Sequence, residues 1–339
     1  MEIKEIAKEF SISEITEVSI IKGGHINQSF LVTNKKNGKF VLQKINTSIF
    51  KNPVDIIENL IKVNQHLKTT KYPYQIADLR LTINGDSYFT NDYGFWRATE
   101  YIKNSKAIQI CTNNKTAVNT GKAYGDFVKF LNELKLNDIK TILPNFRKPE
   151  LWFIELEKAI NINYKSRVEN THELISKARY FKTIIGEYNS VIKNHTKRIL
   201  HNDTKVGNLL FNSDETTVNA VIDLDTVMPG YLINDFGDMV RSVCNSAVED
   251  ESDLTNVIFN LDYYNVLKDS YIDSLNGIIT NEEISSFQIG IKTILYTQFL
   301  RFLSDYLSGD EYYQIEYSEQ NLNRAKVQME LLEQIIKFC

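Results

Sequence analysis

The chain has 339 residues, 42% of them hydrophobic, and 39 Lys and Arg against 43 Asp and Glu give a formal net charge of −4. This length and hydrophobic content are enough for two lobes with a core in each. The weakly negative balance argues against nucleic acid as a partner. Cys111, Cys244 and Cys339 lie too far apart for a disulfide framework or a metal site. We expect a cytoplasmic protein, because the sequence shows no signal-peptide or membrane-spanning pattern.

The pattern of the first hundred residues predicts strands with one helix among them. β-Branched residues gather in short stretches, and the dipeptides Asn37-Gly38 and Asn84-Gly85 are typical of tight hairpin turns. Asn52-Pro53 is typical of a helix start, and apolar residues recur at helical spacing from Ile56 to Leu67. The expected strands are 15–21, 28–33, 40–45, 77–83 and 87–102, with the helix between the third and the fourth.

Beyond these residues the pattern changes to helices, interrupted by a compact strand-and-turn region at 198–227. We therefore expect an α+β chain of two lobes. The small lobe, 1–103, is β-rich with one main helix, and the larger lobe, 104–339, is mostly helical. Only five prolines occur and no linker composition is visible, so the lobes should meet at a tight hinge.

The strand-and-turn region carries the densest polar chemistry in the sequence. Phosphoryl transfer needs a carboxylate that accepts the proton of the acceptor hydroxyl, and oxygen ligands for the Mg²⁺ that bridges the phosphates of ATP. In the kinase template an aspartate is followed five residues later by an asparagine, and a second aspartate follows a later strand. Asp203, Asn208 and Asp223 stand in this pattern. We predict Asp203 as the catalytic base, Asn208 and Asp223 as Mg²⁺ ligands, and ATP as the phosphoryl donor.

Another interpretation starts from Asp235-Phe236-Gly237, which spells the metal-binding triplet of protein kinases. This triplet lies well beyond Asp203, whereas Asp223 follows an apolar run that predicts the end of a strand. We therefore expect Asp235 to hold the backbone of the catalytic loop from a helix. A further alternative is that the Asp and Asn residues of the region only cap turns, which these residue types favour on their own.

Two neighbours of Asp203 favour the catalytic interpretation. Lys205 is placed to steady the transferring phosphate as a point charge, with a solvated surface lysine as the alternative. His201 precedes the base, and we expect it to support the loop rather than to exchange protons.

The nucleotide should contact the small lobe. Gly23-Gly24-His25 lies between the first two strands, where small residues let backbone amides approach phosphates, although a plain turn is the alternative. Gln43 or Lys44 stands where a kinase keeps its phosphate-gripping lysine, and Glu58 on the following helix is the natural partner. Alternation along a strand puts Gln43 and Lys44 on opposite faces, so that only one of them points into the cleft. The sequence leaves open which one.

These residues resemble the phosphotransferase superfamily of aminoglycoside and choline kinases, which has a protein-kinase-like fold. Within it, the chain most resembles the N-acetylhexosamine 1-kinases. The wider resemblance rests on the spacing of His201, Asp203, Asn208 and Asp223. The closer one rests on longer strings that run in the expected order over nearly the whole chain: 41–46 (VLQKIN), 201–205 (HNDTK), 221–230 (VIDLDTVMPG), 235–238 (DFGD) and 301–307 (RFLSDYL).

The resemblance implies ATP- and Mg²⁺-dependent transfer to the anomeric hydroxyl of an N-acetylhexosamine, GlcNAc or GalNAc, giving the sugar 1-phosphate and ADP. It implies that Asp203 also binds this hydroxyl. It further implies that Arg301 and Tyr312 line the sugar pocket, with Tyr317 as another candidate.

The chain departs from the family at two points. Gly207 stands where a polar residue is expected, which leaves the metal ligands intact. Glu100, Tyr101 and Ile102 occupy the expected hinge, where backbone groups should bind the nucleotide base, and they lack the family's usual basic residue. This second departure leaves the nucleotide preference open.

Two other functions remain open from the sequence. A kinase of the same fold acting on an amino alcohol, homoserine or an aminoglycoside would need carboxylates to hold a cationic acceptor, and Glu249-Asp250-Glu251 is a possible source. The other is a non-catalytic nucleotide-binding module. The joint presence of Asp203, Asn208 and Asp223 argues against that module. The sequence does not indicate an oligomeric state.

Overall fold

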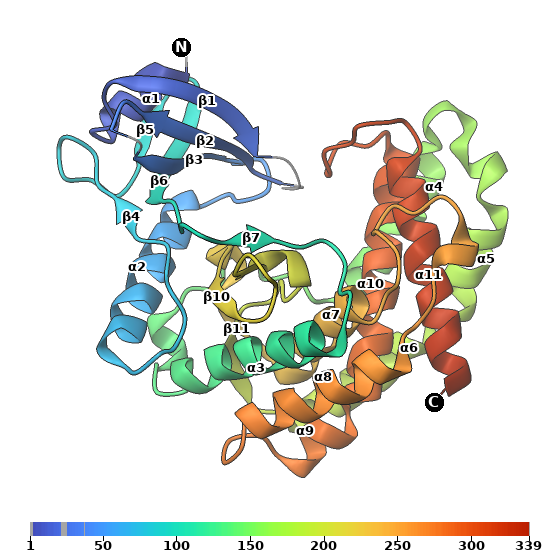
Figure 1. Ribbon diagram of the computed structural model, residues 1–339. Coiled ribbons are helices and arrows are strands. Elements are labelled where there is room, and N and C mark those ends of the chain that lie inside the picture. The colour runs from blue at the N-terminus through green and yellow to red at the C-terminus, as the bar shows by residue number, and fades with distance from the viewer. Residues whose placement is uncertain (1–2, 22–25, 37, 339) are drawn as a thin grey trace.

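The computed structural model describes residues 3–21, 26–36 and 38–338. It has two lobes, a small one built on a sheet and a larger one built mainly of helices (Figure 1). The α+β class and the kinase-like division into a β-rich and a helical lobe are therefore confirmed. The expected boundary at 103/104 stays a prediction. It lies between strand β6, which ends at Glu100, and strand β7 (Lys106–Ala107), which pairs with a strand of the large lobe.

The sheet of the small lobe has the strand order β1-β2-β3-β6-β4, and β5 also pairs with β6. Side chains of the central strands β3 and β6 point alternately to the two faces of the sheet, and these faces have different neighbours. Leu42 and Trp96 pack on one face with helix α1 (Ile3–Glu9), whereas Gln43 and Arg97 form a register pair that faces the large lobe. The strands are β1 Ile15–Ile21, β2 Gln28–Asn34, β3 Lys39–Ile45, β4 Leu79–Arg80, β5 Phe89–Asn91 and β6 Gly94–Glu100.

The single strand expected at 87–102 is wrong, because the structure folds this segment into a hairpin. Strands β5 and β6 pair across a turn that precedes Gly94, and Gly94 has a φ of +137° that favours glycine. Strand β4 pairs with the same edge of β6 instead of forming a hairpin with the segment after Gly85. The Asn84-Gly85 turn therefore exists, but it joins two strands that lie end to end along β6.

Helix α2 (Pro53–Thr69) begins at the predicted proline and ties the small lobe to the large one. Its buried Asn59 donates hydrogen bonds to the carbonyl oxygens of Lys140 and Val227 at 2.8 and 3.1 Å. Its apolar side chains Leu60, Val63 and Leu67 belong to the core of the large lobe. The helix therefore serves as a common wall for both lobes.

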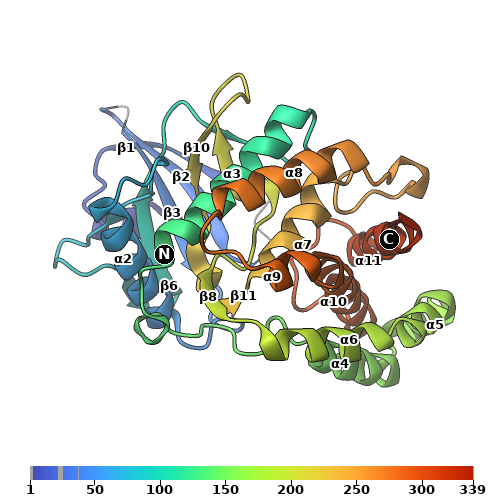
Figure 2. The same cartoon turned by 90° about the horizontal axis from the view of Figure 1, so that it is seen from below.

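In the large lobe, helix α10 runs through the middle and packs against α4, α7 and α11 (Figure 2). Every residue of α10 from Thr293 to Leu307 is buried, which is typical of a central core helix. The helices are α3 Asn114–Leu131, α4 Pro149–Ile162, α5 His172–Tyr180, α6 Thr183–Val191, α7 Leu232–Val243, α8 Leu261–Ser274, α9 Asn281–Ser285, α10 Phe287–Ser308 and α11 Gln320–Phe338. None of the helices in the described part of the chain is both long and apolar enough to cross a membrane.

Short strands between α6 and α7 form the floor of the region between the lobes. Strand β8 pairs with β11, and β9 pairs with both β10 and β7. The bounds are β8 Lys197–Leu200, β9 Leu209–Phe211, β10 Val218–Val221 and β11 Met228–Tyr231. The loops after β8 and after β10 both open toward the small lobe, and they carry the residues predicted for catalysis.

Candidate active site

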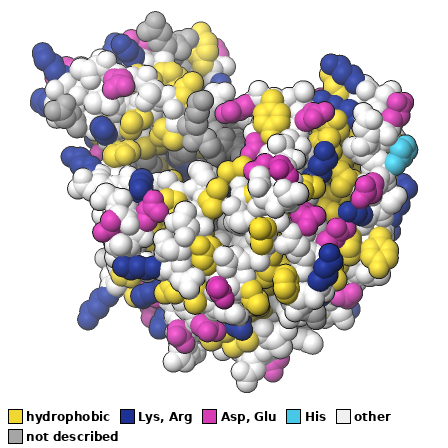
Figure 3. All heavy atoms as spheres, turned by 45° about the vertical axis from the view of Figure 1, so that its right-hand side comes forward, with side chains coloured by type: hydrophobic (Ala, Val, Ile, Leu, Met, Phe, Trp, Pro, Cys, Tyr) yellow, Lys and Arg dark blue, Asp and Glu magenta, His cyan; other side chains and the backbone are white. Residues whose placement is uncertain are grey.

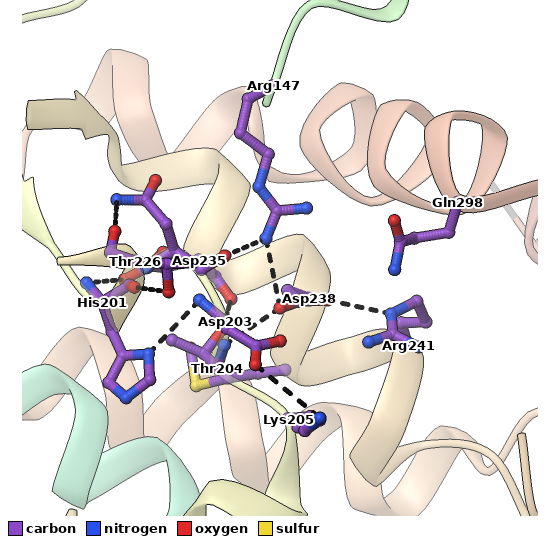
Figure 4. A network of polar contacts seen from close by, with 12 residues as sticks. Arg147, His201, Asp203, Thr204, Lys205, Thr226, Asp235, Asp238, Arg241 and Gln298 are labelled. Carbon is purple, nitrogen blue, oxygen red and sulfur yellow. Dashed lines mark hydrogen bonds and ion pairs between the residues drawn. The ribbon is translucent and has the colours of Figure 1, made fainter. Parts of the chain in front are cut away.

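The loop after β8 is held in place by a carboxylate from helix α7. Asp235 is completely buried, and its two carboxylate oxygens accept hydrogen bonds from the backbone N–H groups of His201 and Asn202 at 3.1 and 2.9 Å (Figure 4). The expectation that Asp235 supports the catalytic loop from a helix is therefore confirmed. His201 is also buried and contacts the carbonyl oxygen of Ile222 at 2.9 Å, which joins this loop to the one after β10.

The predicted base and one predicted metal ligand are in direct contact. The side-chain nitrogen of Asn208 lies 2.7 Å from Oδ2 of Asp203 and 2.9 Å from its carbonyl oxygen. The Lys205 ammonium lies 3.7 Å from the same carboxylate oxygen, which is a loose ion pair. The Asp203 side chain is 26% exposed, so a substrate can reach it.

The electrostatics of this loop keep Asp203 ionised. Burial by itself would raise the pKa of Asp203, but the charge of Lys205 and the hydrogen bond from Asn208 help to lower it to about 2. Burial would lower the pKa of Lys205, but Asp203 and Asp223 raise it, so the ammonium stays charged. The loop therefore presents a carboxylate and an ammonium side by side at neutral pH.

Asp223 stands at the end of β10 in a strained backbone conformation. Its φ is +60°, in the left-handed region that few residues other than glycine adopt. Burial, together with the negative charges of Asp225 and Asp203, raises the pKa of Asp223 to about 7. A carboxylate in such surroundings is favourably neutralised by a cation.

This donor set fits Mg²⁺ held together with the phosphates of a nucleotide. Mg²⁺ prefers oxygen ligands and is commonly bound by one or two side chains plus phosphate oxygens rather than by an all-protein cage. Asn208 and Asp223 offer an amide and a carboxylate oxygen, and both line the same cleft. The described residues contain no cluster of three or more His, Cys, Asp or Glu side chains that could hold a metal ion.

Several supporting residues were not predicted from the sequence. The buried Asp238 accepts a hydrogen bond from the backbone of Thr204 at 2.9 Å and one from Arg241 at 2.9 Å. Arg147 contacts both Asp238 and the carbonyl oxygen of Asn202 (Figure 4). Asp238 follows Asp235 by three residues, so one face of α7 carries both. That spacing is the one feature of the sequence that indicates a shared role for Asp238, and no sequence feature indicates the role of Arg147.

A cleft of about 1140 Å³ lies between the lobes. Its walls include the expected hinge residues Glu100, Tyr101 and Ile102 from the small lobe. They also include Lys205, Asn208 and Asp223 from the large lobe. The structure thus gathers residues that are far apart in the sequence around one space, as a bilobal kinase site requires.

The structure places Gln43, not Lys44, in this cleft. Gln43 lines it, whereas the Lys44 ammonium lies on the other face of the sheet, 5.8 Å from the centre of the Trp96 ring. Glu58 does not reach the cleft either, because its carboxylate lies 2.8 Å from Lys140 on the outside of α2. Gly23, Gly24 and His25 lie outside the described residues.

Two further residues join the lobes across the cleft and were missed from the sequence. Arg97 of β6 lies 2.5 Å from a carboxylate oxygen of Asp225, two residues after the predicted metal ligand. Asn27 donates a 2.7 Å hydrogen bond to the other oxygen of Asp225. The register of β3 with β6, which places Arg97 beside Gln43, could not be derived from the sequence pattern.

Arg301 lies in an aromatic cluster. It is 4% exposed, and its guanidinium carbon lies 4.8 to 5.4 Å from the ring centres of four aromatic side chains. It donates hydrogen bonds to Gln298 at 2.6 Å and to the Tyr312 hydroxyl at 3.2 Å, while its buried Nε has no hydrogen-bond partner. The four rings belong to Phe146, Trp152, Tyr312 and Tyr313.

This cluster stands close to the catalytic loop but not in the lining of the main cleft. Burial by itself would lower the pKa of Arg301, but Tyr313, Tyr312 and the charge of Asp203 raise it, so Asp203 is within electrostatic reach. The side chain of Gln298 extends from α10 toward that of Arg241 (Figure 4). Tyr317 lies farther out, 42% exposed, with its hydroxyl 3.2 Å from the Asp250 carboxylate.

Two carboxylates near this end of the cleft have partners. Glu249 lies 2.5 Å from Arg241, and Asp250 accepts a 2.7 Å hydrogen bond from Gln320. Arg324 also lines this part of the cleft. On the face shown in Figure 3, Lys and Arg are scattered among Asp and Glu without a broad surface of one sign.

Comparisons with known proteins agree with this geometry. The model of the phosphotransferase enzyme family matches residues 17–257. A solved microcompartment-associated aminopropanol kinase superposes with a TM-score of 0.64 at 12% identity, with 99% of this chain and 97% of that chain covered. An aminoglycoside phosphotransferase from Alicyclobacillus acidocaldarius gives 0.63 at 11% identity, with 100% and 96% covered. The Plasmodium vivax ethanolamine kinase gives 0.59 at 14%, with 93% and 82% covered. At such identities these structures share the fold.

Proposed function

Because the chain belongs to the phosphotransferase enzyme family, we propose that it transfers the terminal phosphoryl group of ATP to the anomeric hydroxyl of an N-acetylhexosamine. The chain is a small-molecule kinase that uses ATP and Mg²⁺. Our proposal concerns the identity of the acceptor and the residues that bind and activate it. The product would be the sugar 1-phosphate, with ADP released.

The catalytic part of the proposal rests on Asp203. Its low pKa keeps it ionised, so it accepts a hydrogen bond from the acceptor hydroxyl and aims that oxygen at the terminal phosphate. Little proton transfer is needed before the phosphoryl group moves, because the transition state of phosphoryl transfer is loose. The proton passes to Asp203 as the new bond forms. Lys205 lies beside this path and offsets negative charge on the transferring group.

One observation favours an uncharged sugar as the acceptor. Glu249 and Asp250 at the acceptor end are paired with an arginine and an amide group, and Arg241, Arg301 and Arg324 lie on the same side. A cationic amino alcohol would meet this positive charge, and the carboxylates of Glu249 and Asp250 already have other partners. A sugar with hydroxyl groups and an acetamido oxygen instead offers acceptors to arginine N–H donors.

Arg301 is the residue that we propose for recognition of the sugar, together with Tyr312. A guanidinium has five N–H donors in a fixed plane, and the Nε–H of Arg301 has no partner although it is buried. Aromatic rings such as Trp152 and Tyr312 stand beside it and can pack against the apolar face of a pyranose ring. Tyr317 would act from the outer edge, through Asp250.

The alternative acceptor is an amino alcohol, homoserine or an aminoglycoside, since the similar structures named above include kinases of the first and last kinds. One assay separates the two. Purified protein with Mg-ATP is offered N-acetylglucosamine, N-acetylgalactosamine, glucose, choline, homoserine and kanamycin in turn, and ADP release is followed. Turnover confined to the acetamido sugars supports the proposal. Turnover confined to the cationic acceptors overturns it.

A further inference from the structure

Among the residues that the structure describes, the lysine and glutamate pair that the kinase template puts in the small lobe does not form. Gln43 takes the inward position on β3, Lys44 packs on the opposite face beside Trp96, and Glu58 pairs with Lys140 outside the cleft. Among the described residues of strands β1 to β6 that line the cleft, Arg97 is the one with a positive charge. Its side-chain contacts therefore bear on how the phosphates of ATP would be held.

Arg97 is fixed from two sides. Its Nε donates a 3.0 Å hydrogen bond to the side-chain oxygen of Gln43, and Gln43 in turn donates one to the Ser29 hydroxyl at 3.0 Å. Its Nη1 lies 2.5 Å from Oδ1 of Asp225, and both side chains are at most 4% exposed. A guanidinium held at Nε and Nη1 keeps its plane and direction, which a solvated lysine would not.

The same carboxylate ties down the start of strand β2. Asp225 accepts a 2.7 Å hydrogen bond from Asn27, and Asn27 accepts one from the backbone of Asn46 at 2.9 Å. Asp225 thus contacts two side chains of the small lobe, Arg97 and Asn27. It follows the proposed metal ligand Asp223 by two residues. The charge of Arg97 acts on Asp223 as well, since it works against the raised pKa of that carboxyl.

From this geometry we infer that Arg97 is the phosphate-gripping cation of the nucleotide site, positioned by Gln43 and Asp225. The guanidinium has N–H donors beyond the two in use, and arginine suits the planar, forked recognition of phosphate oxygens. The partner carboxylate of a kinase lies on a helix of the small lobe, whereas here it lies on the metal-binding loop of the large lobe. Contact with the phosphates and contact between the lobes are therefore made by the same side chain.

This inference rests on the ATP-dependent activity and not on the acceptor proposed above, so its test uses nucleotide binding alone. Affinities of the intact protein for ATP, ADP, AMP and adenosine are measured by titration calorimetry. In Arg97→Gln, the affinity for ATP and ADP should fall roughly tenfold to a hundredfold, as expected for the loss of a charge-assisted hydrogen bond. The affinity for adenosine should stay within about twofold of the parent value, because the base and ribose do not contact Arg97.

Two further variants separate binding from folding. Arg97→Gln combined with Asp225→Asn leaves no unpaired buried charge, and it should show the same phosphate-dependent loss. Gln43→Lys in the Arg97→Gln background puts an ammonium on the same face of β3, and it should recover most of the ADP affinity.

The matched control is Arg198→Gln. Arg198 forms an ion pair at 3.0 Å with the buried Glu283 and does not line the cleft, so its loss should lower stability without changing affinity for any of the four ligands. The inference is overturned if Arg97→Gln binds ADP like the parent protein. It is equally overturned if adenosine and ADP weaken by the same factor, which is what a merely structural ion pair between the lobes would produce.

Discussion

The side-chain nitrogen of Asn208 lies 2.7 Å from a carboxylate oxygen of Asp203, so the proposed metal ligand also orients the proposed base. The amide has two N–H donors and one oxygen, and its nitrogen donates to Asp203. Its oxygen is thereby left to a cation. In the roles that we propose, this one short loop would position both the acceptor hydroxyl and Mg²⁺.

Replacing Asp203 by asparagine tests this loop. Asp203→Asn keeps the size of the side chain but removes the negative charge that accepts the hydroxyl proton, so turnover should fall about a hundredfold to ten-thousandfold. The melting temperature should change little, because the side chain is partly exposed. Initial rates of ADP release and a thermal melt of both proteins check this. Retention of most of the parent rate would contradict the role given to Asp203.

The pH dependence should follow Asp223. Its pKa is raised to about 7, and only the ionised carboxylate binds a metal ion, so protonation competes with Mg²⁺ as the pH falls below 7. The Mg²⁺ concentration for half-maximal rate should rise about tenfold per pH unit below 7 and level off above 8. Asp203, with a pKa of about 2, does not titrate in this range.

Rates at several free Mg²⁺ concentrations between pH 5.5 and 8.5 measure this effect, with the protonation and Mg²⁺ binding of ATP itself taken into account. A Mg²⁺ requirement that stays constant over this range would contradict the assignment of Asp223.

The glycine of Asp235-Phe236-Gly237 has a packing role that can be tested through stability. A Cβ atom on Gly237 would lie 2.7 Å from the carbonyl oxygen of Gly290, where α7 crosses α10. Gly237→Ala should therefore lower the free energy of unfolding by about 1–3 kcal/mol, as overpacking does. Gly186→Ala in α6 is the control, since a Cβ there meets nothing within 4 Å, and it should leave stability unchanged or slightly raised. Denaturant titrations compare the two, and equal stability in both variants would contradict the packing argument.

That same triplet shows where sequence reasoning succeeded and where it could not. Asp235 was correctly assigned to support the catalytic loop, because Asp223 had the better spacing and followed a strand. The ring centre of Phe236 lies 3.9 Å from that of Phe287. The phenylalanine of the triplet therefore serves helix packing rather than metal binding. A motif of three letters was therefore misleading, whereas spacing combined with expected strand ends was informative.

The residues that were missed share a physical cause. The position of Arg97 depends on the register of β3 with β6, and the role of Asp225 depends on how closely the lobes approach. Neither quantity leaves a local pattern in the sequence. The sequence left the choice between Gln43 and Lys44 open for the same reason. Successive side chains of a strand lie on opposite faces of the sheet, but the sequence does not show which face lines the cleft.

The recognition role of Arg301 predicts a change in KM for the sugar alone. Arg301→Lys keeps the positive charge but loses the planar fork, so KM for the acetamido sugar should rise roughly tenfold to a hundredfold while KM for ATP stays the same. Arg167→Lys is the control, because Arg167 also stacks on tyrosine rings, but its partners Tyr164, Tyr306 and Asp310 are not among the residues assigned to the site. Steady-state kinetics with each substrate varied in turn decide this. Equal rises in both KM values would contradict the assignment of Arg301.

The central claim concerns the atom that is phosphorylated, and phosphorus NMR of the reaction product tests it most directly. With N-acetylglucosamine or N-acetylgalactosamine and Mg-ATP, the account predicts one new phosphorus signal coupled to the anomeric proton of the sugar. This signal should grow about a hundredfold to ten-thousandfold more slowly with Asp203→Asn. A signal coupled to a proton at any other carbon, or a new phosphate ester formed only with choline, homoserine or kanamycin, would contradict it.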